Sequence, residues 1–214
     1  MEGTEFYSEP DNIYEKLREL SFLSIIICGS SVPKGRDLKT CLARGNIKDV
    51  LEQCESGCES RDICGLYWRL KIAEKLMERK YGTPLVMELE FAKANLLQHG
   101  AFIDLLEDAI INQRERDRML IIIIIPEEGG IGPLTEFNVF FCSELKDRIR
   151  LIVHRKYNPL YIEDDKMGYA SARYLTFLGR VGYLFVFDSY EELPLLVRRI
   201  VEAEKKRISA ERMR

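Results

Sequence analysis

The chain has 214 residues, of which 46% are hydrophobic and 31% are charged, and its formal net charge is −3. This composition indicates a globular protein that is long enough to bury its own core. The slight negative charge argues against nucleic acid as a partner, because nucleic-acid-binding proteins usually carry a basic surface.

The sequence contains no apolar run long enough to span a bilayer. Its start, Met1-Glu-Gly-Thr-Glu, is acidic and lacks the basic and apolar parts of a signal peptide. We therefore expect a cytoplasmic protein with no membrane partner. We also expect a single domain over residues 1–214, with a leading segment at 1–20 and a charged, frayed helical tail at 203–214.

Six cysteines raise the question of a metal site or a disulfide. The cluster at Cys54, Cys58 and Cys64 lacks the paired C-x2-C spacing of zinc ligands, so we expect no metal. A disulfide from Cys64 to Cys54 or Cys58 is the alternative in a hyperthermophile, where intracellular disulfides occur. The abundance of Glu, Lys, Arg and Ile points to a thermophilic source.

Apolar residues are spaced alternately like strands and like helices along the chain. We expect strands at 22–28, 85–87, 121–125, 149–154 and 183–187. We expect helices within 1–20, at 47–53, 63–79, 91–98, 102–116, 133–145 and 168–180, and from 193 onward. The buried stripe of helix 63–79 is predicted to be Leu66, Leu70, Ala73, Leu76 and Met77.

Strands that alternate with helices predict a Rossmann-like α/β fold, a three-layer sandwich. Its five-stranded, mostly parallel sheet would be covered by helices on both faces. In such sheets ligands bind beyond the carboxyl ends of the strands, at the point where the strand order reverses.

The stretch from Ile121 to Glu136 carries the strongest functional signal. Five consecutive isoleucines predict a central strand that is buried on both faces. Gly129, Gly130 and Gly132 then allow a tight turn before a predicted helix. A strand, a glycine turn and a helix N-terminus are a common place to hold a phosphate. Glu136 would place a carboxylate beside that site, although a carboxylate in a first helical turn also stabilises the helix by itself.

A second loop follows the first predicted strand at Gly29, Ser30 and Ser31. Glycine and hydroxyl groups there can donate hydrogen bonds to a phosphate. Because both loops follow strands of one parallel sheet, we expect them to converge on one crevice.

Three other residues are candidates for contacts with a substrate. Glu128 lies in the glycine turn, Asp104 on the predicted helix 102–116, and His154 at the end of a predicted strand. Each has a structural alternative: loop solvation for Glu128, a solvated helix face for Asp104 and core packing for His154.

Two of these stretches resemble known families. The segment Gly129-Gly-Ile-Gly-Pro-Leu-Thr-Glu136 resembles the GGxGTxxE motif of the LOG phosphoribohydrolases, which release cytokinin bases, with Pro133 in place of threonine. The segment Ile27-Cys-Gly-Ser-Ser31 is similar to the first strand and loop of that family. The wider SLOG superfamily includes nucleotide sensors as well as enzymes. An acidic segment at Ile103–Asp108, the apolar run Ile121–Ile125 and the glycine turn from Glu127 to Glu136 follow one another. In this order, most of residues 22–190 also resemble the nucleoside deoxyribosyltransferase-like group, which includes the N-glycosidase effectors of retron defence systems.

The resemblance implies hydrolysis or transfer at the N-glycosidic bond of a nucleoside or nucleotide, including NAD-type substrates, without a cofactor. Glu136 would be the catalytic carboxylate, either as a nucleophile or as a clamp on the ribose hydroxyls, because departure of the base builds positive charge on the sugar. A 5′-phosphate would lie on the glycine N–H groups. Related sites are often completed by a neighbouring subunit, so we expect a homodimer. The alternative is a non-catalytic, SLOG-like nucleotide sensor or an interaction module.

Overall fold

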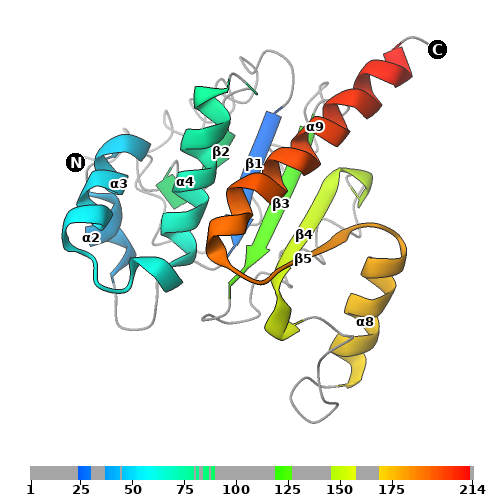
Figure 1. Ribbon diagram of the computed structural model, residues 1–214, viewed down its shortest axis with the longest axis horizontal. Helices are drawn as coiled ribbons and strands as arrows, with labels where there is room; N and C mark the ends of the chain where they lie inside the picture. Colours follow the sequence, from blue (N-terminus) through cyan, green and yellow to red (C-terminus); the bar gives the residue numbers. More distant parts are fainter. Residues whose placement is uncertain are drawn as a thin grey trace, which may run out of the picture.

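The computed structural model describes residues 24–29, 37–43, 45–79, 81, 84–86, 88–89, 119–126, 146–157 and 169–212. Its strands are β1 (Ser24–Gly29), β2 (Pro84–Val86), β3 (Met119–Ile125), β4 (Ile149–His154) and β5 (Leu184–Phe187). Its α-helices are α2 (Leu38–Leu42), α3 (Ile47–Gly57), α4 (Gly65–Glu78), α8 (Tyr169–Arg180) and α9 (Leu193–Arg212) (Figure 1). Short 3-10 turns are η1 (Arg61–Ile63), η3 (Lys146–Arg148), η4 (Arg155–Tyr157) and η5 (Tyr190–Glu192).

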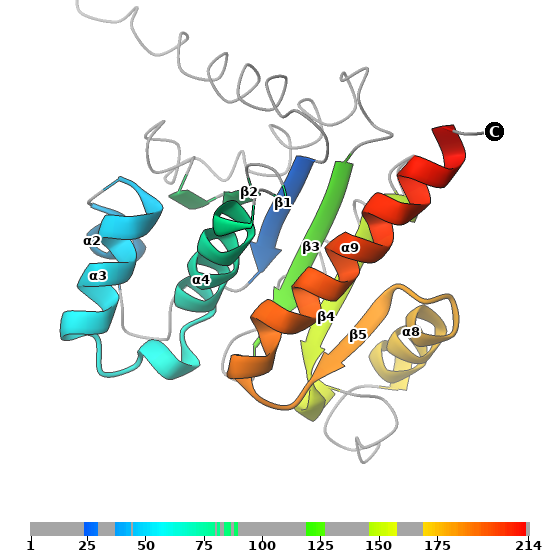
Figure 2. The same ribbon diagram turned by 45° about the horizontal axis from the view of Figure 1, so that its top comes forward.

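The five strands form one sheet in the order β2-β1-β3-β4-β5, which Figure 2 shows side by side. Every pairing between these strands is parallel. The order reverses between β1 and β3, because the chain moves outward from β1 to β2 and then returns past β1 to continue on the other side. This is a doubly wound α/β arrangement, and it confirms the predicted Rossmann-like fold.

The isoleucine run occupies the centre of the sheet, as its composition predicted. β3 pairs with β1 on one side and with β4 on the other. All seven of its residues are at most 2% exposed. Alternate side chains of a strand point to opposite faces, so both faces of β3 are buried. Stiff, β-branched residues therefore fill the position where a strand has no solvent-facing side.

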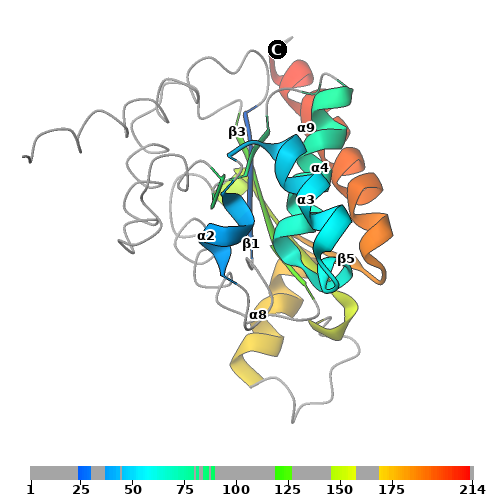
Figure 3. The same ribbon diagram turned by 90° about the vertical axis from the view of Figure 1, so that its left-hand side faces the viewer.

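α3, α4 and α9 lie on one side of the sheet (Figure 3). Four of the five positions predicted for the buried stripe of α4 are confirmed, because Leu66, Leu70, Ala73 and Leu76 are at most 2% exposed. The prediction for Met77 is wrong, since its side chain is 38% exposed. Each helical residue is rotated by about 100° from the one before it, which turns Met77 away from the sheet at the border of the stripe.

The end of α9 also differs from the prediction. A frayed tail was expected from residue 203, but the helix continues to Arg212 and buries Glu204 and Ile208 to 3% exposure each. The Glu204 carboxylate accepts hydrogen bonds from Arg148 at 3.0 Å and Arg150 at 3.2 Å, and it also pairs with Arg207. These contacts join the end of the helix to the start of β4, so the charged tail is packed.

Other differences concern element ends and one short helix. α2 was not predicted: Asp37 caps it by accepting hydrogen bonds from the N–H groups of Lys39 and Thr40. The helix expected at 47–53 begins after the N-cap Asn46 and runs on to Gly57. The helices expected within 1–20 and at 91–98, 102–116 and 133–145 lie outside the described residues.

Candidate functional site

The carboxyl ends of β1 and β3 lie next to each other in the sheet. Gly29, the last residue of β1, is in register with Ile124 of β3. The two predicted loops thus leave the sheet from neighbouring strands, at the place where the strand order reverses. Of the loop residues, Gly29 is described, whereas Ser30, Ser31, Glu128, Gly129, Gly130, Gly132 and Glu136 lie outside the described residues, as does Asp104 on its predicted helix.

Gly29 is needed for the close approach of these two strand ends. Its φ angle is +144°, a conformation that favours glycine. A Cβ atom at this position would lie 2.2 Å from the carbonyl oxygen of Ile124, which belongs to the backbone and cannot rotate away. The glycine therefore lets β1 end against β3 at the point where the candidate crevice begins.

His154 ends β4, one residue beyond the pairing of Val153 with Ile125. Its side chain is 7% exposed, and its Nδ1 accepts a hydrogen bond from the N–H of Lys156 at 3.3 Å. The ring packs edge-on to Phe187 at 5.3 Å between centroids and parallel to Tyr190 at 6.2 Å. His154 thus lies at the predicted edge of the sheet, within a group of aromatic rings.

A buried ion pair at the same edge was missed by the sequence analysis. Arg69 of α4 is fully buried and pairs through Nη1 with Oε2 of Glu88, which follows the end of β2. Arg69 Nε also donates to the carbonyl oxygen of Gly65 at 3.3 Å. The pair is separated by 19 positions in the sequence, so no local spacing pattern could have indicated it.

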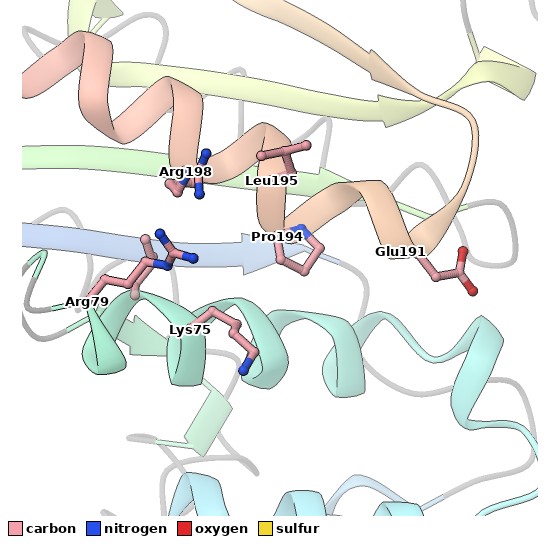
Figure 4. Close-up of a pocket in the computed structure, with 7 residues that line it drawn as sticks. Lys75, Arg79, Glu191, Pro194, Leu195 and Arg198 are labelled. Carbon is pink, nitrogen blue, oxygen red and sulfur yellow. The ribbon is translucent and has the colours of Figure 1, made fainter.

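A surface cavity of about 240 Å³ lies on the helical side of the sheet, between α4 and α9 (Figure 4). Leu76, Pro194 and Leu195 line it together with cations of both helices, and Glu191 lies at one end. Two of these cations have nearby carboxylates: Lys75 pairs with Glu78 at 2.9 Å and Arg198 with Glu202 at 3.5 Å. No lining residue comes from the end of β1 or β3, so this cavity is separate from the predicted crevice.

The five described cysteines are free thiols, so the alternative of a disulfide from Cys64 is not realised. Burial, and to a smaller extent the neighbouring Cys64, Cys58 and Cys41, raise the pKa of Cys54 to about 11. Burial also raises the pKa of Cys64. Among the described residues, no three His, Cys, Asp or Glu side chains are arranged to hold a metal ion.

The fold and the strand-end geometry define this chain as a Rossmann-like α/β protein with its candidate site at the switch point of the sheet. No protein-family model, no curated protein and no solved structure matches the chain. In the part of the chain that the structure describes, no helix is long and apolar enough to cross a membrane.

Proposed function

We propose that the chain binds a nucleoside or nucleotide at the carboxyl ends of β1 and β3 and cleaves its N-glycosidic bond. The observation that supports this most is the pairing of Gly29 with Ile124 at the reversal of strand order. Ligands of doubly wound sheets bind at this point. The proposal also uses the two glycine-containing loops that follow these strands in the sequence, at 29–31 and 129–132.

In this proposal the loop N–H groups bind the phosphate or the sugar, and Glu136 supplies the negative charge for the reaction. As the bond from the base to C1′ breaks, positive charge develops on the sugar ring. A carboxylate next to C1′ either stabilises that charge or attacks C1′ and forms a covalent intermediate. The sugar is then transferred either to water, as in a hydrolase, or to a second base, as in a transferase.

The test is release of free base from a panel of nucleosides, nucleoside monophosphates and NAD, measured by liquid chromatography. Wild-type protein is compared with Glu136→Gln, which keeps the size of the side chain and removes its charge. We expect the variant to lose activity by about 100-fold or more, the usual effect of removing such a group. Glu78→Gln is the matched control, because Glu78 is an exposed residue of α4 that pairs with Lys75.

Two results would contradict the enzymatic proposal in different ways. If Glu136→Gln releases base as fast as wild type, Glu136 is not the catalytic carboxylate. If wild type binds a nucleotide by calorimetry but releases no base from any panel member, the chain is a nucleotide sensor, the alternative expected from its resemblance to SLOG proteins.

A further inference from the structure

The ion pair of Arg69 and Glu88 is asymmetric in its exposure. Arg69 is fully buried, whereas the Glu88 side chain remains 13% exposed. One carboxylate oxygen, Oε2, is bound by the guanidinium. Within the described part of the chain, the other oxygen, Oε1, makes no hydrogen bond. Oε1 therefore keeps its capacity to accept a hydrogen bond from another donor.

Glu88 lies beside the end of β1, on the side away from β3. β1 and β2 are parallel, and Ile27 is in register with Val86. Gly29 is two residues beyond Ile27, and Glu88 is two residues beyond Val86, so both lie at the same carboxyl edge. The end of β1 therefore lies between the end of β2, which Glu88 follows, and the end of β3.

We propose that Glu88 accepts a hydrogen bond from a sugar hydroxyl of the nucleotide, through its open oxygen Oε1. This inference rests on the proposed function, because it places the ligand at the ends of β1 and β3. Arg69 is then a positioning residue, which fixes the other oxygen of Glu88 and keeps a permanent positive charge behind it.

The chemistry of the pair suits a sugar. An ionised carboxylate only accepts hydrogen bonds, and sugar hydroxyls are donors. Nucleotide-binding proteins of the doubly wound class use an acidic residue for the ribose hydroxyls. A buried guanidinium costs much free energy unless it is paired, so the fold holds this carboxylate in place whether or not a ligand is bound. The acceptor is thereby ordered before the sugar arrives.

The test combines a protein variant with the removal of single hydroxyls from the ligand. Affinity for adenosine, 2′-deoxyadenosine, 3′-deoxyadenosine and 2′,3′-dideoxyadenosine is measured by calorimetry, with release of free base followed for the same compounds. For the ribonucleoside, Glu88→Gln is expected to weaken binding by about 10- to 100-fold, the usual loss for a hydrogen bond to a charged group. For the analogue that lacks the contacted hydroxyl, the same variant should change binding by less than about 2-fold.

Glu88→Asp guards against a loss of folding in the first variant. It keeps the charge that Arg69 requires but withdraws the carboxylate by one methylene, so the same dependence on the hydroxyl is expected. Glu78→Gln is again the matched control and should leave all four affinities unchanged. A melting temperature within a few degrees of wild type shows that each variant is folded.

The outcomes separate this inference from the proposed function. If Glu88→Gln and Glu88→Asp weaken the binding of all four compounds equally, Glu88 has only a structural role, and the proposed function still stands. If wild type neither binds nor cleaves any nucleoside, nucleotide or NAD, the proposed function fails and the role of Glu88 fails with it. A loss that disappears for one deoxy analogue supports the inference and identifies the hydroxyl.

Discussion

Gly29→Ala tests the contact on which the candidate site depends, the approach of β1 to β3. The new Cβ atom would lie 2.2 Å from the Ile124 carbonyl oxygen and 3.1 Å from the Ile124 nitrogen. Both are backbone atoms of the central strand, so the clash is relieved only if the two strands move apart. The φ angle of +144° adds a second cost, because alanine rarely adopts it.

The two costs can be estimated separately. A non-glycine residue in such a backbone conformation costs about 1–3 kcal/mol. Overpacking that displaces a backbone typically costs about 1–3 kcal/mol more. We therefore expect Gly29→Ala to lower the free energy of unfolding by about 2–6 kcal/mol. For a chain of this length each kcal/mol lowers the melting temperature by about 2–4 °C.

Two other glycines provide matched controls. Gly45 has a φ angle of +74°, and no atom lies within 4 Å of the position that a Cβ would take, so Gly45→Ala carries the backbone cost alone. Gly57 is the last residue of α3 and also has open space at that position, so Gly57→Ala should be neutral or stabilise the protein by up to about 1 kcal/mol. The free energy of unfolding is measured for all three by urea denaturation followed by circular dichroism. If Gly29→Ala lowers the free energy of unfolding no more than Gly45→Ala does, β1 and β3 do not approach each other as closely as described.

Glu204→Gln should cost about 3–5 kcal/mol in urea denaturation, because it removes the buried carboxylate that neutralises Arg148 and Arg150. The exposed Glu78→Gln should cost less than about 1 kcal/mol, and equal losses would contradict this account. The pKa of Cys54 is raised, mainly by burial, from 9.0 to about 11. The stabilising effect of the neutral, buried thiol is therefore fully present below pH 9 and is lost as the pH rises toward 11. The destabilisation by Cys54→Ala should therefore shrink by about 2–3 kcal/mol between pH 8 and pH 11, and a constant difference would show that this thiol titrates normally.

The sequence predicted the sheet well because its strands are apolar on both faces. The predicted strand 149–154 has the observed bounds of β4, and 121–125 lies inside β3. The closing helix was also predicted by its apolar stripe, and Leu193, Val197 and Val201 are fully buried. In each case burial depends on the residue itself and its near neighbours, which a local pattern records.

Features that depend on polar contacts were missed. α2 has five residues and is fixed by the Asp37 cap, and a helix of this length is too short to show an apolar period. Glu204 falls in the tail that was expected to be frayed, because its partners Arg148 and Arg150 lie 56 and 54 positions away. Nothing in the sequence indicated the role of Glu88 either, because its partner Arg69 lies 19 positions away. A charged residue is as compatible with a buried pair as with solvent until the fold brings its partner next to it.

The site was predicted only as far as the strands determine it. Two glycine loops were expected to converge, and the structure places the ends of their strands, Gly29 and Ile125, at adjacent positions of one edge. This followed from the parallel sheet and required no knowledge of the loops themselves. The conformation of a loop depends on contacts that its own sequence does not encode as a period.

The central position of β3 also affects how the protein tolerates unfolding. A seven-residue segment of methionine, leucine and isoleucine, without charge or proline, has the composition of segments that form intermolecular cross-β structure. In the folded sheet its backbone is covered by β1 and β4, while the outer strands β2 and β5 have only three and four residues. The edge strands of the described sheet are thus short, and the aggregation-prone strand β3 becomes accessible only when the sheet opens. The rate of irreversible inactivation on heating therefore depends on how often the sheet opens, because an opened molecule can aggregate with another before it refolds.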